Sequence, residues 1–180
     1  MENVWITRGI LWIPLLEIWD YPQWVSDGEV GERMASVHDV AAYILGKFDQ
    51  PISTMKLQKL CYYSQGWSLA WDEEPLFTSK IEAWANGPVV YDLFDKHRGR
   101  FTVSDWPEGN PSALSQTERE TVDAVCDHYG KLTGQQLSDM THSETPWLEA
   151  RKHVPAGQRS NASVSPDVMQ EFFSALSATA

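Results

Sequence analysis

The sequence is poor in cysteine and in cations, and each shortage excludes a class of protein. Cys61 and Cys126 are the only cysteines and neither belongs to a CxxC pair, which argues against a disulfide scaffold and against a zinc ribbon. Lysine and arginine number 14 against 25 aspartates and glutamates, which gives a net charge of -11. Sequence-independent nucleic-acid binding depends on cations that displace counterions. We therefore expect no nucleic-acid partner for this chain alone.

Long apolar runs are also missing. The most apolar stretch, residues 9–19, is interrupted by Pro14 and Glu17 and is shorter than the ~20 residues that a bilayer span needs. It lacks the basic start and the small-residue cleavage site of a signal peptide, so we expect a cytoplasmic protein without a membrane partner. The polar, glycine-rich residues that follow indicate a linker. We interpret Met34 as the natural start, residues 1–33 as an N-terminal extension from an upstream start, and residues 34–180 as a single helical domain.

The usual catalytic and metal-binding patterns are absent. None of the five histidines belongs to HExxH or stands at ligand spacing from a cysteine. His142 and Glu144 are two positions apart and do not share a helix face, so capping or hydrogen bonding is favoured for His142 over metal ligation. Cys126 and His128 have the same spacing, and apolar neighbours should raise the thiol pKa. We expect no enzyme, no cofactor and no metal, with Cys61 and Cys126 reduced, buried and inert.

The composition that remains is that of one globular domain, with 42% hydrophobic and 22% charged residues. Capping residues and apolar spacing predict helices over 37–45, 55–71, 88–97, 116–129, 134–140, 145–150 and 166–176. Residues 100–114 are expected to be a long exposed loop, and residues 155–163 a polar loop. The fold class is therefore mainly all-α: a compact bundle of about six or seven short helices. Near residues 75–88 the sequence leaves a short β-hairpin and an extended loop equally open.

Helix 55–71 is expected to be central. One of its stripes contains Leu57, Leu60, Cys61, Ser64, Trp67 and Trp71, whereas Tyr62, Tyr63 and Leu69 lie off that stripe. Because apolar and aromatic residues occupy more than one side, this helix should bury more than one face.

Three stretches together resemble one family. They are residues 56–66 (KLQKLCYYSQG), 81–91 (IEAWANGPVVY) and 137–147 (LSDMTHSETPW). In this order and spacing they are similar to the Panacea domain, the SocA-like antitoxin family that is common in prophages. The resemblance spans roughly residues 36–176. Cys61 and Ser64 depart from the more usual apolar or small residues, and residues 1–33 have no counterpart.

The resemblance implies a protein that acts by binding. Members neutralise a toxin encoded by an adjacent gene through direct contact, as in a type II-like toxin–antitoxin system, and at least one delivers its toxin to a bacterial protease. The function expected here is an antitoxin. The alternatives are a proteolytic adaptor, which would add a protease as partner, another prophage-associated interaction protein, or a phage-derived enzyme. Some relatives carry a DNA-binding domain, for which residues 1–33 are too short.

Two groups of residues are candidates for the site. The first lies partly off the core stripe of helix 55–71 and has the polar and aromatic character of interface hot spots, so it is the candidate for toxin binding: Lys56, Gln58, Lys59, Tyr62 and Tyr63. A structural role is equally open for Lys56, Lys59 and Tyr62, and Tyr63 is also a candidate core residue. The second contains motif residues with either a structural or an interface role: Glu82, Trp84, Gly87, Pro88, Val89, His142, Glu144, Pro146 and Trp147. For Trp84 and Trp147 a structural role is favoured over an interface role. Gly87-Pro88 is more typical of a fixed turn than of a contact with a partner.

Overall fold

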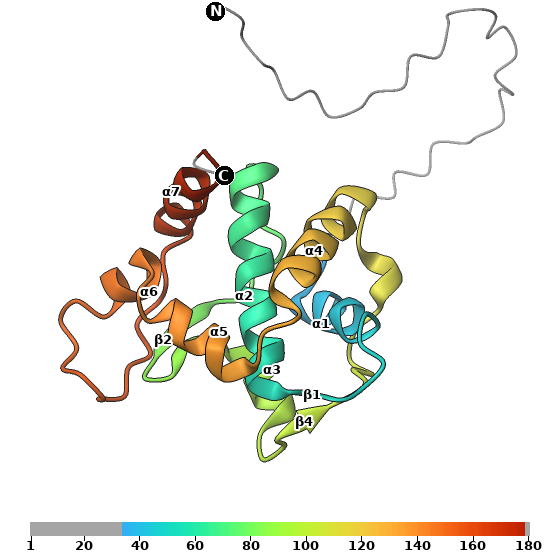
Figure 1. The fold of residues 1–180 in the computed structure, drawn as a ribbon, viewed down its shortest axis with the longest axis horizontal. Coiled ribbons are helices and arrows are strands. Elements are labelled where there is room, and N and C mark those ends of the chain that lie inside the picture. The colour runs from blue at the N-terminus through green and yellow to red at the C-terminus, as the bar shows by residue number, and fades with distance from the viewer. Residues whose placement is uncertain (1–33, 179–180) are drawn as a thin grey trace, which may run out of the picture. The chain divides into compact units, whose positions relative to one another are not determined.

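The computed structural model describes residues 34–178, so the predictions for residues 1–33 lie outside the described part of the chain (Figure 1). In chain order its elements are α1 (Val37–Leu45), β1 (Ile52–Ser53), α2 (Thr54–Trp71), β2 (Ile81–Trp84), β3 (Gly87–Val90), α3 (Tyr91–His97), β4 (Thr102–Val103), η1 (Pro111–Ala113), α4 (Gln116–Tyr129), α5 (Gly134–Thr141), α6 (Thr145–Ala150) and α7 (Pro166–Ser177). The mainly helical class is confirmed. Two small antiparallel sheets, β1–β4 and β2–β3, make the described part not strictly all-α.

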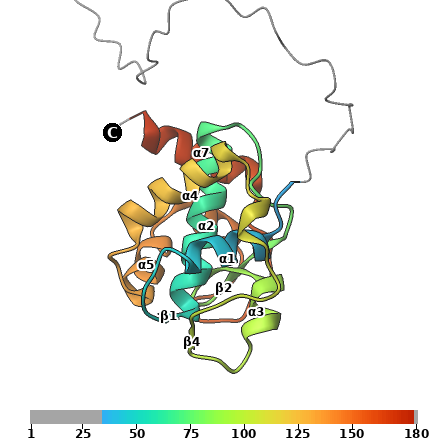
Figure 2. The same ribbon diagram turned by 90° about the vertical axis from the view of Figure 1, so that its right-hand side faces the viewer.

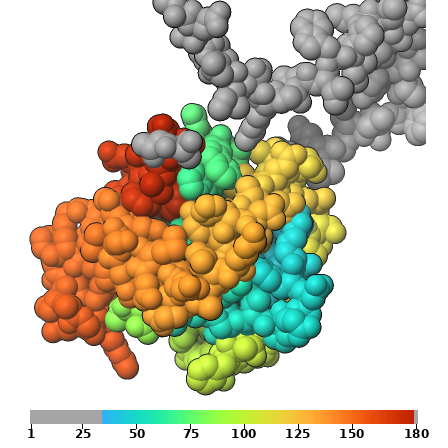
Figure 3. Space-filling view, viewed as in Figure 1, coloured from blue at the N-terminus to red at the C-terminus, as the bar shows by residue number. Residues whose placement is uncertain are grey.

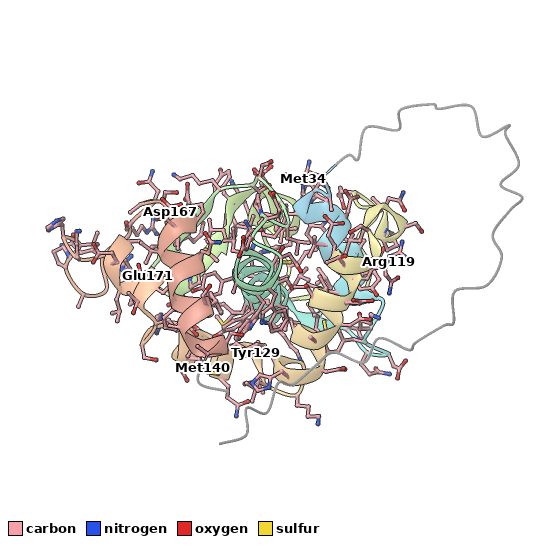
Figure 4. The ribbon with its side chains drawn as sticks, turned by 90° about the horizontal axis from the view of Figure 1, so that it is seen from above. Met34, Arg119, Tyr129, Met140, Asp167 and Glu171 are labelled. Carbon is pink, nitrogen blue, oxygen red and sulfur yellow. The ribbon has the colours of Figure 1, made fainter. Side chains whose placement is uncertain are left out.

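Helix α2 is the central element. It begins after Ser53, whose hydroxyl accepts a hydrogen bond from the Lys56 N–H, and its residues 57–66 are buried without interruption. Figure 4 shows α2 nearly end-on between α7 and α4, and α5 and β3 also pack against it. In Figure 3, residues of α4 to α6 cover its middle, while its C-terminal end is visible between α7 and α4. Because α2 is covered on most sides, its polar residues are buried as well as its apolar ones.

A glycine on α2 leaves room for a ring of α7. A Cβ placed on Gly66 would lie 2.2 Å from Cε2 of Phe173. The Phe173 ring therefore rests directly on the α2 backbone, and it contacts the rings of Tyr62, Tyr63 and Trp67 edge-on. At the end of α2, Trp71 is 38% exposed, although the sequence pattern placed it on the core stripe.

Residues 100–114 are mostly exposed, as the sequence predicted, but the loop is anchored to the domain at a few points. Val103 and Leu114 are buried, and Nε1 of Trp106 donates to Nδ1 of His38 on α1 across 3.1 Å. The N–H of Asn110 donates to Oδ1 of Asp39 on the same helix. The sequence analysis missed these contacts with α1, because isolated anchoring residues follow no periodic pattern.

The hairpin β2–β3 decides between the two alternatives left open for residues 75–88. Strand residue Glu82 pairs with Val89 and Trp84 pairs with Gly87, whose φ of +96° suits the tight turn. The helix predicted over 88–97 is present as α3, but its predicted start is wrong, because Pro88 lies in β3 and α3 begins at Tyr91. Pro88 pairs with Ala83, and the Ala83 N–H points away from β3, to the Ala162 carbonyl. No hydrogen bond joins the two residues of this pair, so the missing N–H of proline is tolerated there.

The outer edge of β2 is covered by the end of the predicted polar loop 155–163. The Ala83 N–H donates to the Ala162 carbonyl across 2.8 Å, and the Val164 N–H donates to the Ile81 carbonyl across 2.9 Å. A segment about eighty positions later in the chain thus returns to the hairpin, which brings residues 159–161 beside it. Figures 1 and 2 show that α3 and the small sheets lie toward one end of α2 and α7 toward the other.

The helix starts predicted from capping residues are confirmed. Reciprocal capping boxes join Ser36 with Asp39, Ser115 with Glu118, and Thr133 with Gln136. Within residues 34–178, no helix has both the length and the apolarity needed to cross a bilayer.

Candidate functional site

The first and second motif segments meet where α2 holds strand β3. Nζ of Lys59 donates to the carbonyls of Asn86 and Pro88, each across 2.9 Å. The Gln58 amide binds Val90 twice, accepting from its N–H across 2.8 Å and donating to its carbonyl across 3.2 Å. Two polar side chains of α2 therefore bind backbone groups of Asn86, Pro88 and Val90.

The third motif segment holds the same hairpin from another side. The Ser138 hydroxyl of α5 donates to the Asn86 carbonyl across 2.8 Å, and Nε1 of Trp147 donates to the Trp84 carbonyl across 2.9 Å. Arg151, just after α6, donates to the Ala83 carbonyl across 2.7 Å. The hairpin turn is thus bound by side chains from three helical segments.

Gly87 is needed where these segments converge. A Cβ on this residue would lie 2.6 Å from both Nζ of Lys59 and Oγ1 of Thr141. Its positive φ also disfavours a side chain. The predicted role of Gly87-Pro88 as a fixed turn agrees with this geometry.

A buried acid completes the core of the motif region. The hydroxyls of Tyr62 and Tyr63 donate to the two carboxylate oxygens of Glu144, across 3.0 and 2.8 Å. Burial raises the pKa of Glu144, which the phenol hydrogen bonds and the charge of Lys59 counteract. Burial lowers the pKa of Lys59 to about 7, against the attraction of Glu144. These side chains are buried, and their polar groups are bonded to one another or to the hairpin backbone inside the fold.

The hairpin carries an open groove on its other face, which we call the hairpin groove. Its volume is about 900 Å³, and it is lined by Glu82, Trp84–Asn86, Val89, Tyr91, Phe94 and Arg159–Asn161. The centroid of the Phe94 ring lies 4.7 Å from that of Trp84 and 6.2 Å from that of Tyr91. Tyr91 remains 42% exposed. The walls are therefore aromatic and reachable by another molecule.

The two charged residues of the hairpin groove differ in whether they have a partner within the domain. The carboxylate of Glu82 accepts from Nζ of Lys80 across 3.2 Å and from Nε1 of Trp84 across 2.8 Å. Arg159 is exposed and has no hydrogen-bond or ion-pair partner within residues 34–178. The acid of the groove is thus neutralised inside the domain, and the cation is not.

A second, smaller hollow of about 230 Å³ is lined by Cys126, Lys47 and Asp123, among others. Nζ of Lys47 and Oδ1 of Asp123 form an ion pair across 2.6 Å. Burial raises the pKa of the Cys126 thiol to about 12, and burial raises the pKa of Cys61 as well. Both cysteines are free, Cys61 buried and Cys126 half-buried, and their protonated thiols are poor nucleophiles at neutral pH. Among the described residues, no three His, Cys, Asp or Glu side chains are grouped to hold a metal ion.

The comparisons with known proteins agree with the motif geometry. The family model described as "Antitoxin SocA-like, Panacea domain" matches residues 57–148, just over half of the chain. The chain belongs to the Panacea domain family. Antitoxin SocA of Caulobacter vibrioides (strain NA1000 / CB15N) is 32% identical over 124 residues, which cover 60% of this chain and 66% of the relative. The match thus spans just under two thirds of that relative. No solved structure matches the chain.

The region that matches the Panacea family coincides with the network around the hairpin. It runs from the first buried turn of α2, through β2 and β3, to α6. The three motif stretches therefore belong to one structural unit, in which α2, α5 and α6 bind the backbone of a single turn.

The predicted toxin-binding residues of this Panacea domain are mostly inside it. Gln58, Lys59, Tyr62 and Tyr63 are at most 3% exposed, so their position off the core stripe does not bring them to the surface. The expectation that helix α2 buries more than one face is confirmed. The cause is that α7, α4, α5 and β3 surround α2, which a helical stripe cannot reveal. Lys56 is half-buried and donates to the Gly130 carbonyl. Toxin contact by these five residues stays a prediction.

The other motif residues divide between the interior and the hairpin groove. Glu82, Trp84 and Val89 line the groove, whereas the remaining members are buried or half-buried in the network: Gly87, Pro88, His142, Glu144, Pro146 and Trp147. His142 is the C-cap of α5, and its ring centroid lies 4.5 Å from that of Trp147. Sequence reasoning missed Tyr91, Phe94 and Arg159, because the groove forms only when residues 159–161 return beside β2.

Proposed function

We propose that this Panacea domain is an antitoxin that neutralises a toxin from an adjacent gene by direct protein–protein binding, without catalysing a reaction. The observation that carries the proposal is the family match over residues 57–148, together with a relative named as an antitoxin. The proposed place of action is the cytoplasm, where such a toxin is made.

The chemistry of the described residues supports binding over catalysis. The polar side chains of the motif stretches are committed to the hairpin backbone and to one another. The thiol of Cys126 is held protonated by burial. What remains open is the hairpin groove, with aromatic walls and an exposed cation. Aromatic and arginine side chains are enriched among the residues that dominate binding energy at protein interfaces.

The test is co-expression of the chain with the product of the neighbouring gene. We expect the neighbour alone to stop growth, the pair to grow, and the two proteins to co-purify. A version of the antitoxin gene with an early stop codon is the control, since it keeps the transcript and removes the protein. Growth restored by the stop-codon version, or a neighbour that is harmless by itself, would refute the proposal.

The same cells distinguish occlusion from delivery to a protease. If the chain acts by occupying the toxin surface, the toxin's half-life stays the same or lengthens when the chain is present. A shortened half-life that returns to normal in a protease-deficient host would replace occlusion with the adaptor role.

A further inference from the structure

The hairpin groove combines an unpaired cation with an exposed aromatic wall. Arg159 lines it without a partner in the described part of the chain, while Glu82 is already bound by Lys80 and Trp84. An unpaired guanidinium presents a planar fork of donors that matches the two oxygens of a carboxylate. In a chain of net charge -11, this is a local site for a negative group.

The aromatic wall is held in place by a second arginine. The guanidinium of Arg98 lies 5.3 Å from the Phe94 ring centroid, and its Nη2 is 3.4 Å from the Tyr91 hydroxyl and 3.2 Å from Oδ1 of Asp95. Phe94 in turn packs edge-on against Trp84. Tyr91 and Phe94 therefore form an ordered aromatic surface against which a bulky apolar side chain can be buried from water.

We propose that the hairpin groove binds a segment of the partner protein in which a carboxylate side chain lies beside a bulky apolar one. The carboxylate pairs with Arg159, and the apolar side chain packs against Tyr91 and Phe94. This inference rests on the proposed function, because it names the part of the toxin that the antitoxin recognises. Charge pairing of this kind contributes to partner choice as well as to affinity.

A nucleic acid fits the hairpin groove less well than a protein segment does. Binding along a phosphate backbone requires several cations that each displace counterions. The cation that lines the groove is Arg159, and Lys80 is engaged with Glu82. One free guanidinium next to an aromatic wall suits a single carboxylate with an apolar neighbour.

The test measures the affinity of purified full-length chain for the toxin identified by co-expression. We expect Arg159→Glu and Tyr91→Ala each to raise the Kd by about tenfold or more. Arg159→Lys should fall between wild type and Arg159→Glu, because an ammonium keeps the charge without the fork. Both sites are exposed and line an open groove, so the thermal unfolding midpoint of all three variants should stay close to that of wild type.

Two matched variants control for the substitutions themselves. Lys131→Glu makes the corresponding charge reversal at an exposed cation outside the groove, and Met140→Ala shortens a side chain that is 38% exposed on α5 (Figure 4). Neither should change the Kd. A toxin variant with one acidic residue reversed to arginine should restore binding to Arg159→Glu and weaken binding to wild type, which would identify the partner's carboxylate.

The outcomes separate this inference from the proposed function. If wild type binds the toxin and both groove variants bind equally well, the groove proposal is wrong and the antitoxin role stands. If wild type binds no product of its operon, the antitoxin role itself fails. If sedimentation shows that the groove variants dissociate a dimer of this chain without changing toxin binding, the occupant is a second copy, and the proposal is overturned.

Discussion

The hydroxyl of Tyr63 lies 2.8 Å from Oε1 of Glu144 and donates a hydrogen bond to it, joining the central helix to the N-cap of α6. Tyr62 donates to the other carboxylate oxygen across 3.0 Å. A buried carboxylate is costly unless its oxygens are bonded. The two tyrosines meet this requirement, so the first and third motif stretches are linked by a hydrogen bond to a buried acid.

Removing this hydrogen bond should destabilise the domain. We expect Tyr63→Phe to lower the free energy of unfolding by about 2 kcal/mol, since bonds to ionisable groups are the stronger ones. With Glu144→Gln, a double-mutant cycle by urea denaturation should give a coupling energy of about 1 kcal/mol. Tyr91→Phe is the control, because its hydroxyl makes only a long, exposed hydrogen bond with Arg98, and it should change the stability by less than about 0.5 kcal/mol. Additive effects of the two buried substitutions would show that the pair is not coupled.

The turn of the hairpin should not tolerate a side chain. Gly87→Ala would place a Cβ 2.6 Å from Nζ of Lys59, at a φ of +96°. We expect a loss of about 3 kcal/mol or more in denaturant titration. Gly99→Ala isolates the backbone effect, because Gly99 also has a positive φ but nothing lies within 4 Å of its added Cβ. That variant should lose only about 1 kcal/mol. Equal losses at the two sites would contradict the contact described for Gly87.

Stability should depend on pH through Lys59. Its pKa is about 7 in the folded chain against a reference value of 10.5, so between these values the unfolded chain binds a proton that the folded chain lacks. Stability from this group therefore rises with pH across that window and is lost as pH falls toward 7. We expect the stability difference between wild type and Lys59→Met to shift in favour of wild type from pH 7 to about 9. A difference that stays constant would show that Lys59 has an ordinary pKa.

The thiols should be unreactive in the folded protein. Burial raises the pKa of both, that of Cys126 to about 12, so a thiol reagent at neutral pH should modify neither until denaturant is added. The Cys126→Ala and Cys61→Ala variants assign any signal that is seen. Rapid modification of Cys126 in the folded protein would instead support the alternative that this chain is a phage-derived enzyme.

The helices could be predicted because their signals are local. Ser115 and Glu118, like Thr133 and Gln136, lie within one turn of each other, so the capping hydrogen bonds depend on neighbouring residues. For the hairpin, the sequence left a β-hairpin and an extended loop equally open and predicted a helix from Pro88. Pro88 fits a helix start by local rules. However, Gln58, which lies thirty-two positions before Val90, binds the Val90 backbone and keeps the segment extended.

The site could not be predicted to the same degree, because it depends on long-range packing. Lys59 is polar in sequence but lies inside the domain, where two carbonyls of a distant turn accept its hydrogen bonds. Trp106 is held to α1 by His38 without any periodic pattern around it. Arg159 reaches the hairpin groove through the pairing of Ala162 with Ala83, for which the polar sequence around it has no local signal.

The most direct measurement is a titration of purified toxin activity with the full-length chain, followed by mass spectrometry of the toxin. If the chain acts by binding, toxin activity falls in proportion to added chain and ends at a fixed molar ratio. The toxin then keeps its mass and regains activity once the two are separated. Loss of activity at a small fraction of that ratio, with a permanent change in toxin mass, would show that a bond is made or broken and would contradict the account.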